Sequence, residues 1–471
     1  MPVLSSEAIE PDGPDTGRRA RSGTGRPLVV DVDSVLLHTN LTTEVAFSEI
    51  AHRSGAVFGL LAALLRGPDA LKRRIAASCH FDPARLSYDP ETVSHLLRVL
   101  GEGRPVYLAS DIHDSAHVNA IAQHLGVFTA WSASPDGARL DAEALSLLQS
   151  WSQGFDYLGC EADALPSGAT RMAPPGSETR SRQTAWRVWA RLLRVHQYAK
   201  NALVLVPLLT AHQFGLWPAL NALLAVAAFS LCASSAYILN DLVDVTADRA
   251  HVTKRNRPIA SGAVAPARAA AIMIVLLLAA IAIAASVSLA FLGVMLGYLA
   301  LTTAYSFRLK RIALIDVVTL AVLYTIRVVA GAVAIGVTMS EWLFAFSLFI
   351  FMSLALVKRY IELNGQRSGE RPMARDYSAG DLSMIAVLAA AAGFNAVVIF
   401  TLYISSDTVR ALYSHPQALW IGCPILMYWI ARVMLLAQRG QIDDDPVIFA
   451  LHDRVSWFAL GAIGAILLVA I

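Results

Sequence analysis

Residues 217–248 read WPALNALLAVAAFSLCASSAYILNDLVDVTAD. An apolar run of membrane-spanning length ends there in three carboxylates, Asp241, Asp244 and Asp248. On a helix, acids three and four positions apart share one face, where their hard oxygens can converge on Mg²⁺, and Mg²⁺ held in this way can bind a diphosphate. Because charges inside or beside a membrane are costly, we interpret the acids as functional. The alternative is a solvated loop whose charges pair locally.

The segment that follows the acids is basic. It reads HVTKRNRPIASG over residues 251–262, and its cations Lys254, Arg255 and Arg257 can bind phosphate oxygens. An acidic cluster followed by a basic cluster beside a membrane predicts a site for ionised phosphate esters. We therefore place Lys254 and Arg257 with the three acids as the candidate catalytic residues.

Composition divides the chain into two parts. Hydrophobic residues make up 56% of the chain and charged residues only 16%, which is far from an average globular protein. Charges are frequent up to about residue 190, and apolar runs separated by short polar loops follow. Hydropathy predicts nine spans, of which the first is short and interrupted by Pro207. They cover 199–215, 217–239, 266–284, 286–304, 313–336, 341–360, 383–405, 417–437 and 455–471.

Loop charges predict the orientation of these spans. Alternate loops hold almost all of the Lys and Arg residues, whereas the opposite loops near 216, 285, 338 and 410 hold only Arg410. We expect a multi-pass protein of the inner (cytoplasmic) membrane with a cytoplasmic N-terminal domain and an external C-terminus. A net charge of +2 gives no case for nucleic acid, and the four cysteines have neither metal-ligand nor disulfide spacing.

The N-terminal part alternates strand and helix patterns. Strands are predicted at 28–31 and 106–109, with helices around 45–77, 90–100 and 114–124, which is typical of a soluble α/β domain with a parallel sheet. Residues 1–26 are rich in Pro, Gly, Ser and Arg and lack an apolar core, so we predict a disordered tail. The expected domains are this tail, an α/β domain at 27–170, a flexible linker at 171–190 and a membrane domain at 191–471.

The membrane part resembles the UbiA-type intramembrane prenyltransferases. The resemblance rests on Asn240-Asp241-x-x-Asp244-x-x-x-Asp248, on Lys254-Arg255-x-Arg257-Pro258 and on Tyr305-Ser306-x-x-Leu309-Lys310. It implies an all-α fold of about nine helices, Mg²⁺ as cofactor and transfer to or from polyprenyl phosphates. Asn240, Tyr305 and Lys310 are then expected to contact substrate. The second acidic motif departs from the family, since Asp316 lacks its partner acid.

Four further stretches resemble the decaprenyl-phosphate phosphoribosyltransferases of that family. This resemblance implies transfer of 5-phosphoribose from phosphoribosyl diphosphate to a polyprenyl monophosphate, with Lys200, Asp316, Arg327 and Lys358 as further substrate-binding residues. Arg327 lies inside a predicted span, so it either lines a polar cavity or pairs with an acid such as Asp316. The stretches are 194–201, 324–331, 358–363 and 445–454.

The chemistry of this transfer suits the residue types. Diphosphate leaving an anomeric carbon gains charge that bound Mg²⁺ would neutralise. The attacking lipid phosphate is already an anion, so positioning by Lys200, Lys254, Arg257 or Lys358 can supply most of the effect without a strong base. Two alternatives stay open: transfer of a polyprenyl group from its diphosphate to an aromatic acceptor, and a non-catalytic scaffold or transporter. The expected partners are the membrane and these lipid and diphosphate substrates, and the oligomeric state is open between monomer and homo-oligomer.

The α/β domain resembles haloacid-dehalogenase-like phosphatases. Asp31-Val-Asp33-Ser-Val35-Leu36 follows an apolar strand, as in their first motif, and Ser110 matches their phosphate-binding hydroxyl. The resemblance implies Asp31 as nucleophile and Asp33 as acid/base. The rest of the pattern is incomplete, because 138–144 contains no Lys and Cys160 replaces an acid. Two interpretations stay open: an inactive scaffolding domain, or a phosphatase that removes the 5-phosphate from a phosphoribosylated lipid.

Overall fold

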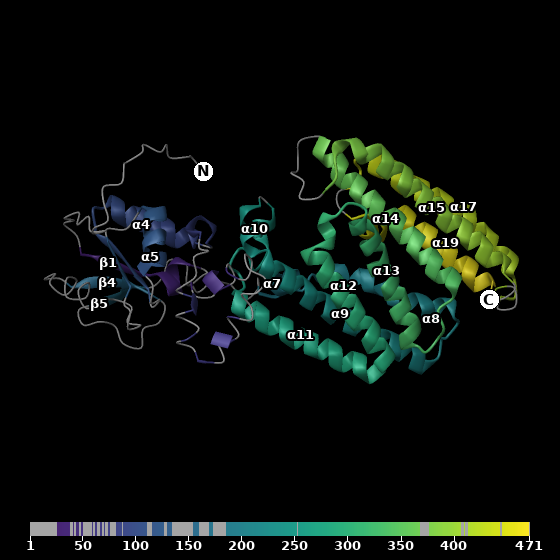
Figure 1. Cartoon of the computed structure of the whole chain (residues 1–471), viewed down its shortest axis with the longest axis horizontal. Coiled ribbons are helices and arrows are strands. Elements are labelled where there is room, and N and C mark those ends of the chain that lie inside the picture. The colour runs from purple at the N-terminus through teal and green to yellow at the C-terminus, as the bar shows by residue number, and fades with distance from the viewer. Residues whose placement is uncertain are drawn as a thin grey trace. The chain divides into compact units, whose positions relative to one another are not determined.

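The computed structural model divides the chain into two compact units. Unit 1 comprises Met1–Leu192 with Asp241–Ala270, and unit 2 comprises Leu193–Asn240 with Ala271–Ile471. Figure 1 shows their elements. The aspartate segment thus belongs to unit 1, although the sequence predicted it within the membrane domain. The structure describes residues 26–37, 41, 44–46, 49, 59, 62–63, 66–67, 70, 74–75, 82–86, 88–110, 115–126, 130–133, 154–159, 169–172, 185–251, 253–367, 376–406, 409, 413–442 and 445–470.

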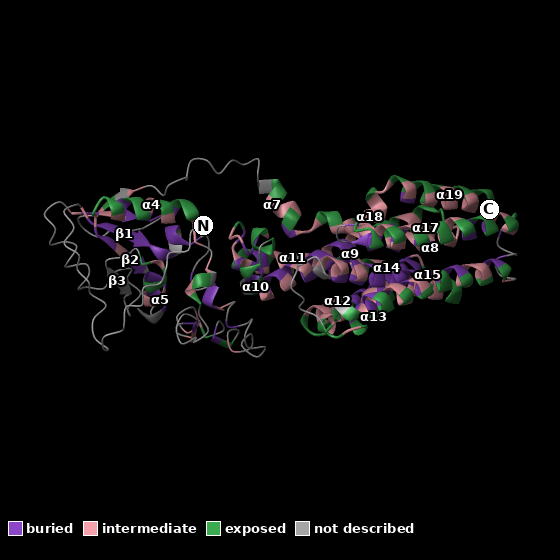
Figure 2. Ribbon diagram, turned by 90° about the horizontal axis from the view of Figure 1, so that it is seen from above, coloured by how far each residue is buried: buried purple, intermediate pink, exposed green. Residues whose placement is uncertain are grey.

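A parallel sheet forms the centre of unit 1. Its strand order is β3-β2-β1-β4-β5, and every pairing is parallel. The side chains of the central strand β1 are buried throughout, as expected for an apolar strand of a covered parallel sheet (Figure 2). The predicted parallel α/β fold is confirmed. The strands are β1 (Leu28–Asp31), β2 (Val106–Ser110), β3 (Ala130–Ala133), β4 (Phe155–Leu158) and β5 (Ala169–Met172).

Two helices of unit 1 lie where the sequence predicted them. They are α4 (Pro90–Gly101) and α5 (Ser115–Leu125). Asp89 caps α4 by accepting a hydrogen bond from the Glu91 N–H, and Pro90 occupies the first helical position. The predicted tail 1–26 falls outside the described residues except for Arg26, as does most of the predicted helix 45–77. Of the predicted linker 171–190, the described ends belong to β5 and to α7 (Ala185–Leu192).

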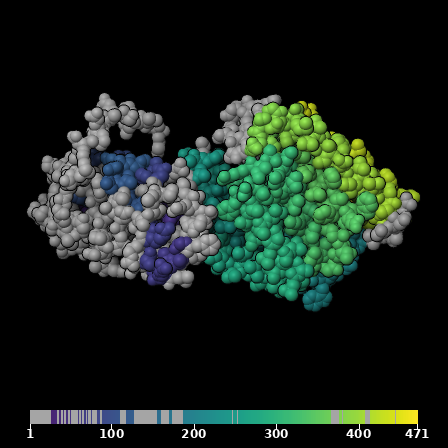
Figure 3. Space-filling model, viewed as in Figure 1, coloured from purple at the N-terminus to yellow at the C-terminus, as the bar shows by residue number. Residues whose placement is uncertain are grey.

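Apolar helices form most of unit 2. Within the described residues, seven helices are long and apolar enough to cross a membrane, and a bent pair makes an eighth candidate. Exposed side chains on these helices are themselves apolar, as at Val275 and Phe458. On the face seen in Figure 3, teal and green segments form the surface of this unit. The seven candidates are α9 (Leu216–Val243), α11 (Pro266–Val287), α12 (Leu289–Phe307), α13 (Ile315–Ala334), α14 (Glu341–Arg367), α15 (Leu382–Ser405) and α17 (Gly422–Gln438) with the preceding η8 (Pro416–Ile421).

The two ends of unit 2 differ from the prediction of nine straight spans. Residues 199–215 fall on η4 (Val195–Leu205), a 3₁₀ helix, and on the five-residue α8 (Val206–Thr210), so the first expected span is not among the described candidate spans and stays a prediction. The last span is bent by 81° between α18 (Pro446–His452) and α19 (Arg454–Ala470). The seven expected spans between 217 and 437 are confirmed, and a total of nine is not reached among the described residues.

Gly331 explains how η4 packs against α13. A methyl group added at Gly331 would lie 2.0 Å from the carbonyl oxygen of Val204 and 3.0 Å from Cδ of Pro207. Only a residue without a Cβ permits this approach of two backbones. The glycine therefore fixes the position of η4, the element that carries Lys200.

Candidate active site

The aspartate segment is not one continuous helix. Helix α9 ends at Val243, and Asp244, with φ −88° and ψ 7°, is the N-cap of the short helix α10 (Val245–Ala250). The expectation that three acids share one helix face is therefore wrong, because the α-helix is interrupted at the middle acid. Asp241 and Asp248 nevertheless converge. Nη1 of Arg257 donates to Oδ1 of Asp241 at 3.0 Å and to Oδ2 of Asp248 at 2.7 Å.

This acid–arginine cluster (Asp241, Asp248 and Arg257) is largely shielded from solvent. Each acid is 3% exposed, whereas the Arg257 side chain keeps 27% of its surface. Burial raises the pKa of Asp248, an effect that the Arg257 guanidinium partly offsets. One guanidinium thus sits against two carboxylates, which favours the binding of further positive charge.

The donor set of the cluster fits Mg²⁺, since two buried carboxylates meet within hydrogen-bond reach of one nitrogen. Among the described residues, no group of three acids, histidines or cysteines stands ready in metal-binding geometry. Asp241, Asp244 and Asp248 therefore stay predicted ligands. Bound there, the ion would neutralise charge on a diphosphate. Around them, Asn240 is half-buried and Lys254, in η5 (Lys254–Asn256), is exposed.

Arg249 joins two parts of unit 1. Its Nη1 and Nη2 donate to the two carboxylate oxygens of Glu44 at 2.6 and 2.7 Å, and its Nε donates to the carbonyl oxygen of Ala260 at 3.0 Å. The Arg249 and Glu44 side chains keep only 8% and 4% of their surface. Such a buried bidentate pair is geometrically specific. The pair ties the segment that holds Asp248 to the N-terminal part, and the bond to Ala260 ties it to the segment that follows Arg257.

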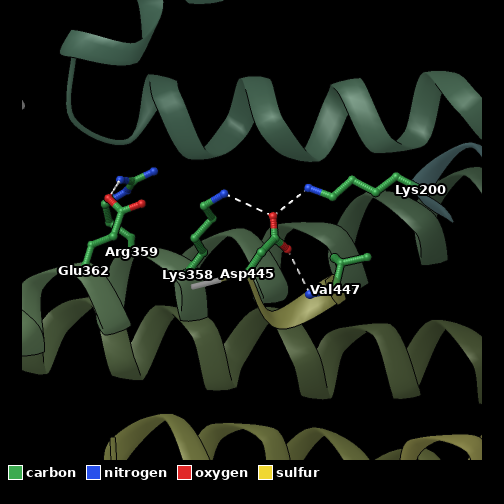
Figure 4. A network of polar contacts seen from close by, with 6 residues as sticks. All are labelled: Lys200, Lys358, Arg359, Glu362, Asp445 and Val447. Atoms are coloured by element: carbon green, nitrogen blue, oxygen red, sulfur yellow. Dashed lines mark hydrogen bonds and ion pairs between the residues drawn. The ribbon is translucent and has the colours of Figure 1, made fainter. Parts of the chain in front are cut away.

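In unit 2, two predicted lysines meet on one carboxylate. Nζ of Lys200 and Nζ of Lys358 both donate to Oδ2 of Asp445, at 2.6 and 3.1 Å (Figure 4). Oδ1 of Asp445 accepts the Val447 N–H at 3.0 Å and thereby caps α18. Burial alone would raise the pKa of Asp445, but Lys358 and Lys200 outweigh it and hold the pKa well below its usual range. The cluster carries two cations and one anion.

Arg327 lies beside this lysine pair. Its guanidinium donates to three neutral oxygens: Oδ1 of Asn201, the Leu323 carbonyl oxygen and the Tyr298 hydroxyl, at 3.0, 2.6 and 2.8 Å. The Tyr324 ring lies 5.5 Å both from Lys200 Nζ and from Arg327 Cζ. Cation–π contacts and neutral oxygens therefore hold this buried guanidinium.

Asp316 does not pair with Arg327. Its Oδ2 lies 2.9 Å from Nε of Arg359, and its Oδ1 accepts the Tyr377 hydroxyl at 2.6 Å. Arg359 also pairs with Glu362, and the Asp316 and Arg359 side chains are almost completely buried. The alternative in which Arg327 pairs with Asp316 is wrong, because Arg359 supplies the cation.

Two further predicted substrate contacts, Tyr305 and Lys310, lie elsewhere in this unit. Tyr305 is half-buried and packs against the apolar core of α9, α11, α12 and α13. Lys310 is half-buried in η6 (Leu309–Arg311). Both stay predicted substrate contacts.

Two residues of the phosphatase-like pattern, Asp31 and Ser110, lie at the carboxyl ends of the neighbouring strands β1 and β2. Asp31 ends β1 and pairs in register with Ala109, one residue before Ser110. Because β1 lies between β2 and β4, Asp31 sits where the strand order reverses, the place at which such sheets bind ligands. The Tyr157 hydroxyl donates to Oδ2 of Asp31 at 3.1 Å. The side chains of Ser110 and of Asp33, in η1 (Val32–Leu36), lie outside the described residues.

The sequence did not predict three residues that form buried ion pairs in the structure: Asp445, Arg359 and Glu44. Asp445 stood in a recognised stretch but was not assigned, although Asp before Pro446 is a helix-start signal. Arg359 directly follows Lys358, and nothing in the sequence distinguishes their roles. No sequence signal links Glu44 to Arg249, which are 205 residues apart.

Known proteins resemble most of this chain. It is 33% identical over 462 residues to y4nM, an uncharacterised protein of Sinorhizobium fredii, covering 93% of this chain and 89% of that protein. It is 33% identical over 295 residues to the decaprenyl-phosphate phosphoribosyltransferase of Mycolicibacterium smegmatis, covering 58% of this chain and 91% of that enzyme. A solved UbiA homologue from Archaeoglobus fulgidus bound to GPP and Mg²⁺ aligns with a TM-score of 0.45 at 15% identity, covering 59% and 99% of the two chains.

Residues 202–462 match the UbiA prenyltransferase family. The matched region includes the acid–arginine cluster, the apolar helices from α9 to α18 and Asp445. It is also long enough to decide the assignment, since it exceeds half of the chain. This chain is a multi-pass membrane transferase that belongs to the UbiA prenyltransferase family.

Proposed function

We propose that this protein transfers 5-phosphoribose from phosphoribosyl diphosphate to a polyprenyl monophosphate in a Mg²⁺-dependent reaction at the inner membrane, with its α/β domain in the cytoplasm. The observation that carries the proposal is the convergence of Lys200 and Lys358 on one carboxylate. Two ammonium groups directed at one anion suit a phosphate acceptor. An uncharged aromatic acceptor presents no such anion. The likeness to decaprenyl-phosphate phosphoribosyltransferases supports the same acceptor class.

In this reaction the acceptor phosphate oxygen forms a bond to the anomeric carbon, and the bond from that carbon to diphosphate breaks. Diphosphate leaves with the electron pair. Asp241, Asp244 and Asp248 would hold Mg²⁺, and Arg257 supplies a guanidinium for phosphate oxygens. Lys200 and Lys358 hold the attacking phosphate, which needs no base because it is already ionised.

The test is a transfer assay on purified full-length protein in detergent with Mg²⁺, a polyprenyl monophosphate and labelled phosphoribosyl diphosphate. We expect label in the lipid, and a loss of about 100-fold or more in Asp248→Asn. Asp381→Asn is the matched control, because Asp381 is an acid in the local capping box of Ser378. It should retain activity.

Other outcomes reassign the function. If no label enters the lipid and the protein instead consumes a prenyl diphosphate with an aromatic acceptor, it is an aromatic prenyltransferase. If it transfers neither group, the scaffold or transporter class remains.

A further inference from the structure

Asp445 occupies the place that an anionic ligand of Lys200 and Lys358 would take. Its Oδ2 is bonded by both ammonium groups, and the Lys200 and Asp445 side chains keep 10% and 7% of their surface. A carboxylate held between two lysines competes directly with a substrate phosphate for the same donors.

We propose that Asp445 competes with the lipid phosphate for Lys200 and Lys358. A dianionic phosphomonoester displaces the Asp445 carboxylate from the two lysines, and the carboxylate then displaces the monoanionic diester product. This inference rests on the proposed function. The acceptor brings two negative charges to the lysines, against one on Asp445. After the new carbon–oxygen bond forms, the same phosphorus carries one negative charge, which Asp445 matches. The carboxylate therefore weakens the binding of both lipids, so that the doubly charged acceptor still displaces it and the singly charged product is released.

Asp445 can release the lysines without disturbing helix α18, because its two carboxylate oxygens have different partners. Oδ1 remains bonded to the Val447 N–H at the start of α18, while Oδ2 alone faces the lysines (Figure 4). A small rotation of the carboxylate can release the lysines without uncapping the helix. Asn is also a good N-cap residue, so Asp445→Asn removes the charge and keeps the cap.

Direct binding tests the proposal with full-length protein in detergent. The probes are farnesyl phosphate, the diester methyl farnesyl phosphate and uncharged farnesol. In Asp445→Asn, the affinity for both phosphates should rise about tenfold, because a competing charge is removed beside the ligand, and the affinity for farnesol should not change. The unliganded variant should melt at a lower temperature, with farnesyl phosphate restoring it, because the buried Lys200 and the half-buried Lys358 lose their anion.

Turnover gives a second readout. The KM for the acceptor should fall together with kcat, because the diester product leaves more slowly. Asp453→Asn is the matched control, since Asp453 caps α19 and pairs with Arg432 at 2.7 and 3.0 Å. It should lose stability without gaining phosphate affinity.

The outcomes separate this inference from the proposed function. Unchanged or weaker phosphate binding in Asp445→Asn overturns the competitor role, even if labelled phosphoribose enters lipid in the wild type. If no phosphoribose is transferred but farnesyl phosphate binds more tightly to the variant, the phosphate site stands and the proposed donor is wrong.

Discussion

At the scale of single residues, the pair Asp316–Arg359 separates a structural role from a substrate-binding one. Arg359→Met removes the cation that faces a fully buried carboxylate, and we expect a loss of about 3–5 kcal/mol in the free energy of unfolding. Thermal unfolding in detergent measures it. The double variant Arg359→Met with Asp316→Leu should recover most of the loss, since an apolar pair leaves no buried charge.

If the double variant also retains transferase activity, Asp316 is structural. A stable but inactive double variant would instead restore the predicted substrate contact. The resemblance to decaprenyl-phosphate phosphoribosyltransferases implied Asp316, Lys200 and Lys358 as substrate-binding residues. It could not pair them, since Lys200 and Asp445 are 245 residues apart and only the folded helices bring them together.

At the scale of elements, the contact between η4 and α13 depends on one glycine. Gly331→Ala would push η4 away, because the new methyl group overlaps the Val204 carbonyl oxygen. Since η4 carries Lys200 and Asn201, we expect transfer activity to fall at least about tenfold through misplaced groups. The transfer assay with labelled donor, together with thermal unfolding, measures both effects.

Gly293→Ala provides the matched control within another apolar helix. A methyl group there would meet no atom of the described chain within 4 Å, so activity should persist and the helix should gain about 0.5–1 kcal/mol. Equal damage from both substitutions would contradict the role given to Gly331. Of the helix glycines Gly293, Gly297 and Gly331, only Gly331 has a neighbouring backbone in close contact, and a small residue in the sequence does not by itself identify what packs against it.

Span boundaries were predictable to within a few residues for α9 to α17, because apolar length reports membrane crossing directly. The ends were not. An Asp that caps a helix reads like an Asp that binds a metal, so the break at Asp244 was invisible in the spacing of the acids. Likewise, a short apolar stretch such as 199–215 does not distinguish a span from the combination of η4 and α8.

At the scale of the whole molecule, unit 1 joins the N-terminal sheet to the segment that carries the predicted catalytic acids. Glu44→Gln leaves the buried Arg249 without its carboxylate partner. The segment that carries Asp248 and Arg249 is then held less firmly against the N-terminal part. We expect weaker use of the diphosphate donor, seen as a higher KM for phosphoribosyl diphosphate and a higher Mg²⁺ requirement in the transfer assay.

Glu49→Gln is the comparison for this variant, because Glu49 is also buried but pairs with Arg74 inside the N-terminal part. It should leave the KM of the donor unchanged. Identical kinetics for both variants and the wild type would show that the α/β part does not support the transferase. Phosphatase activity of the α/β part, with Asp31 at the carboxyl end of β1 as its nucleophile, stays a prediction.

The bend after α18 also bears on the apolar surface that the protein offers to lipid. Helices α18 and α19 are long and apolar enough to span a membrane only when taken together, and the 81° bend between them makes that span broken or re-entrant. Helix α9, with 28 residues, is about 42 Å long and exceeds a hydrocarbon core of about 30 Å in one piece. The apolar surface along α18 and α19 is therefore interrupted, whereas that along α9 is continuous.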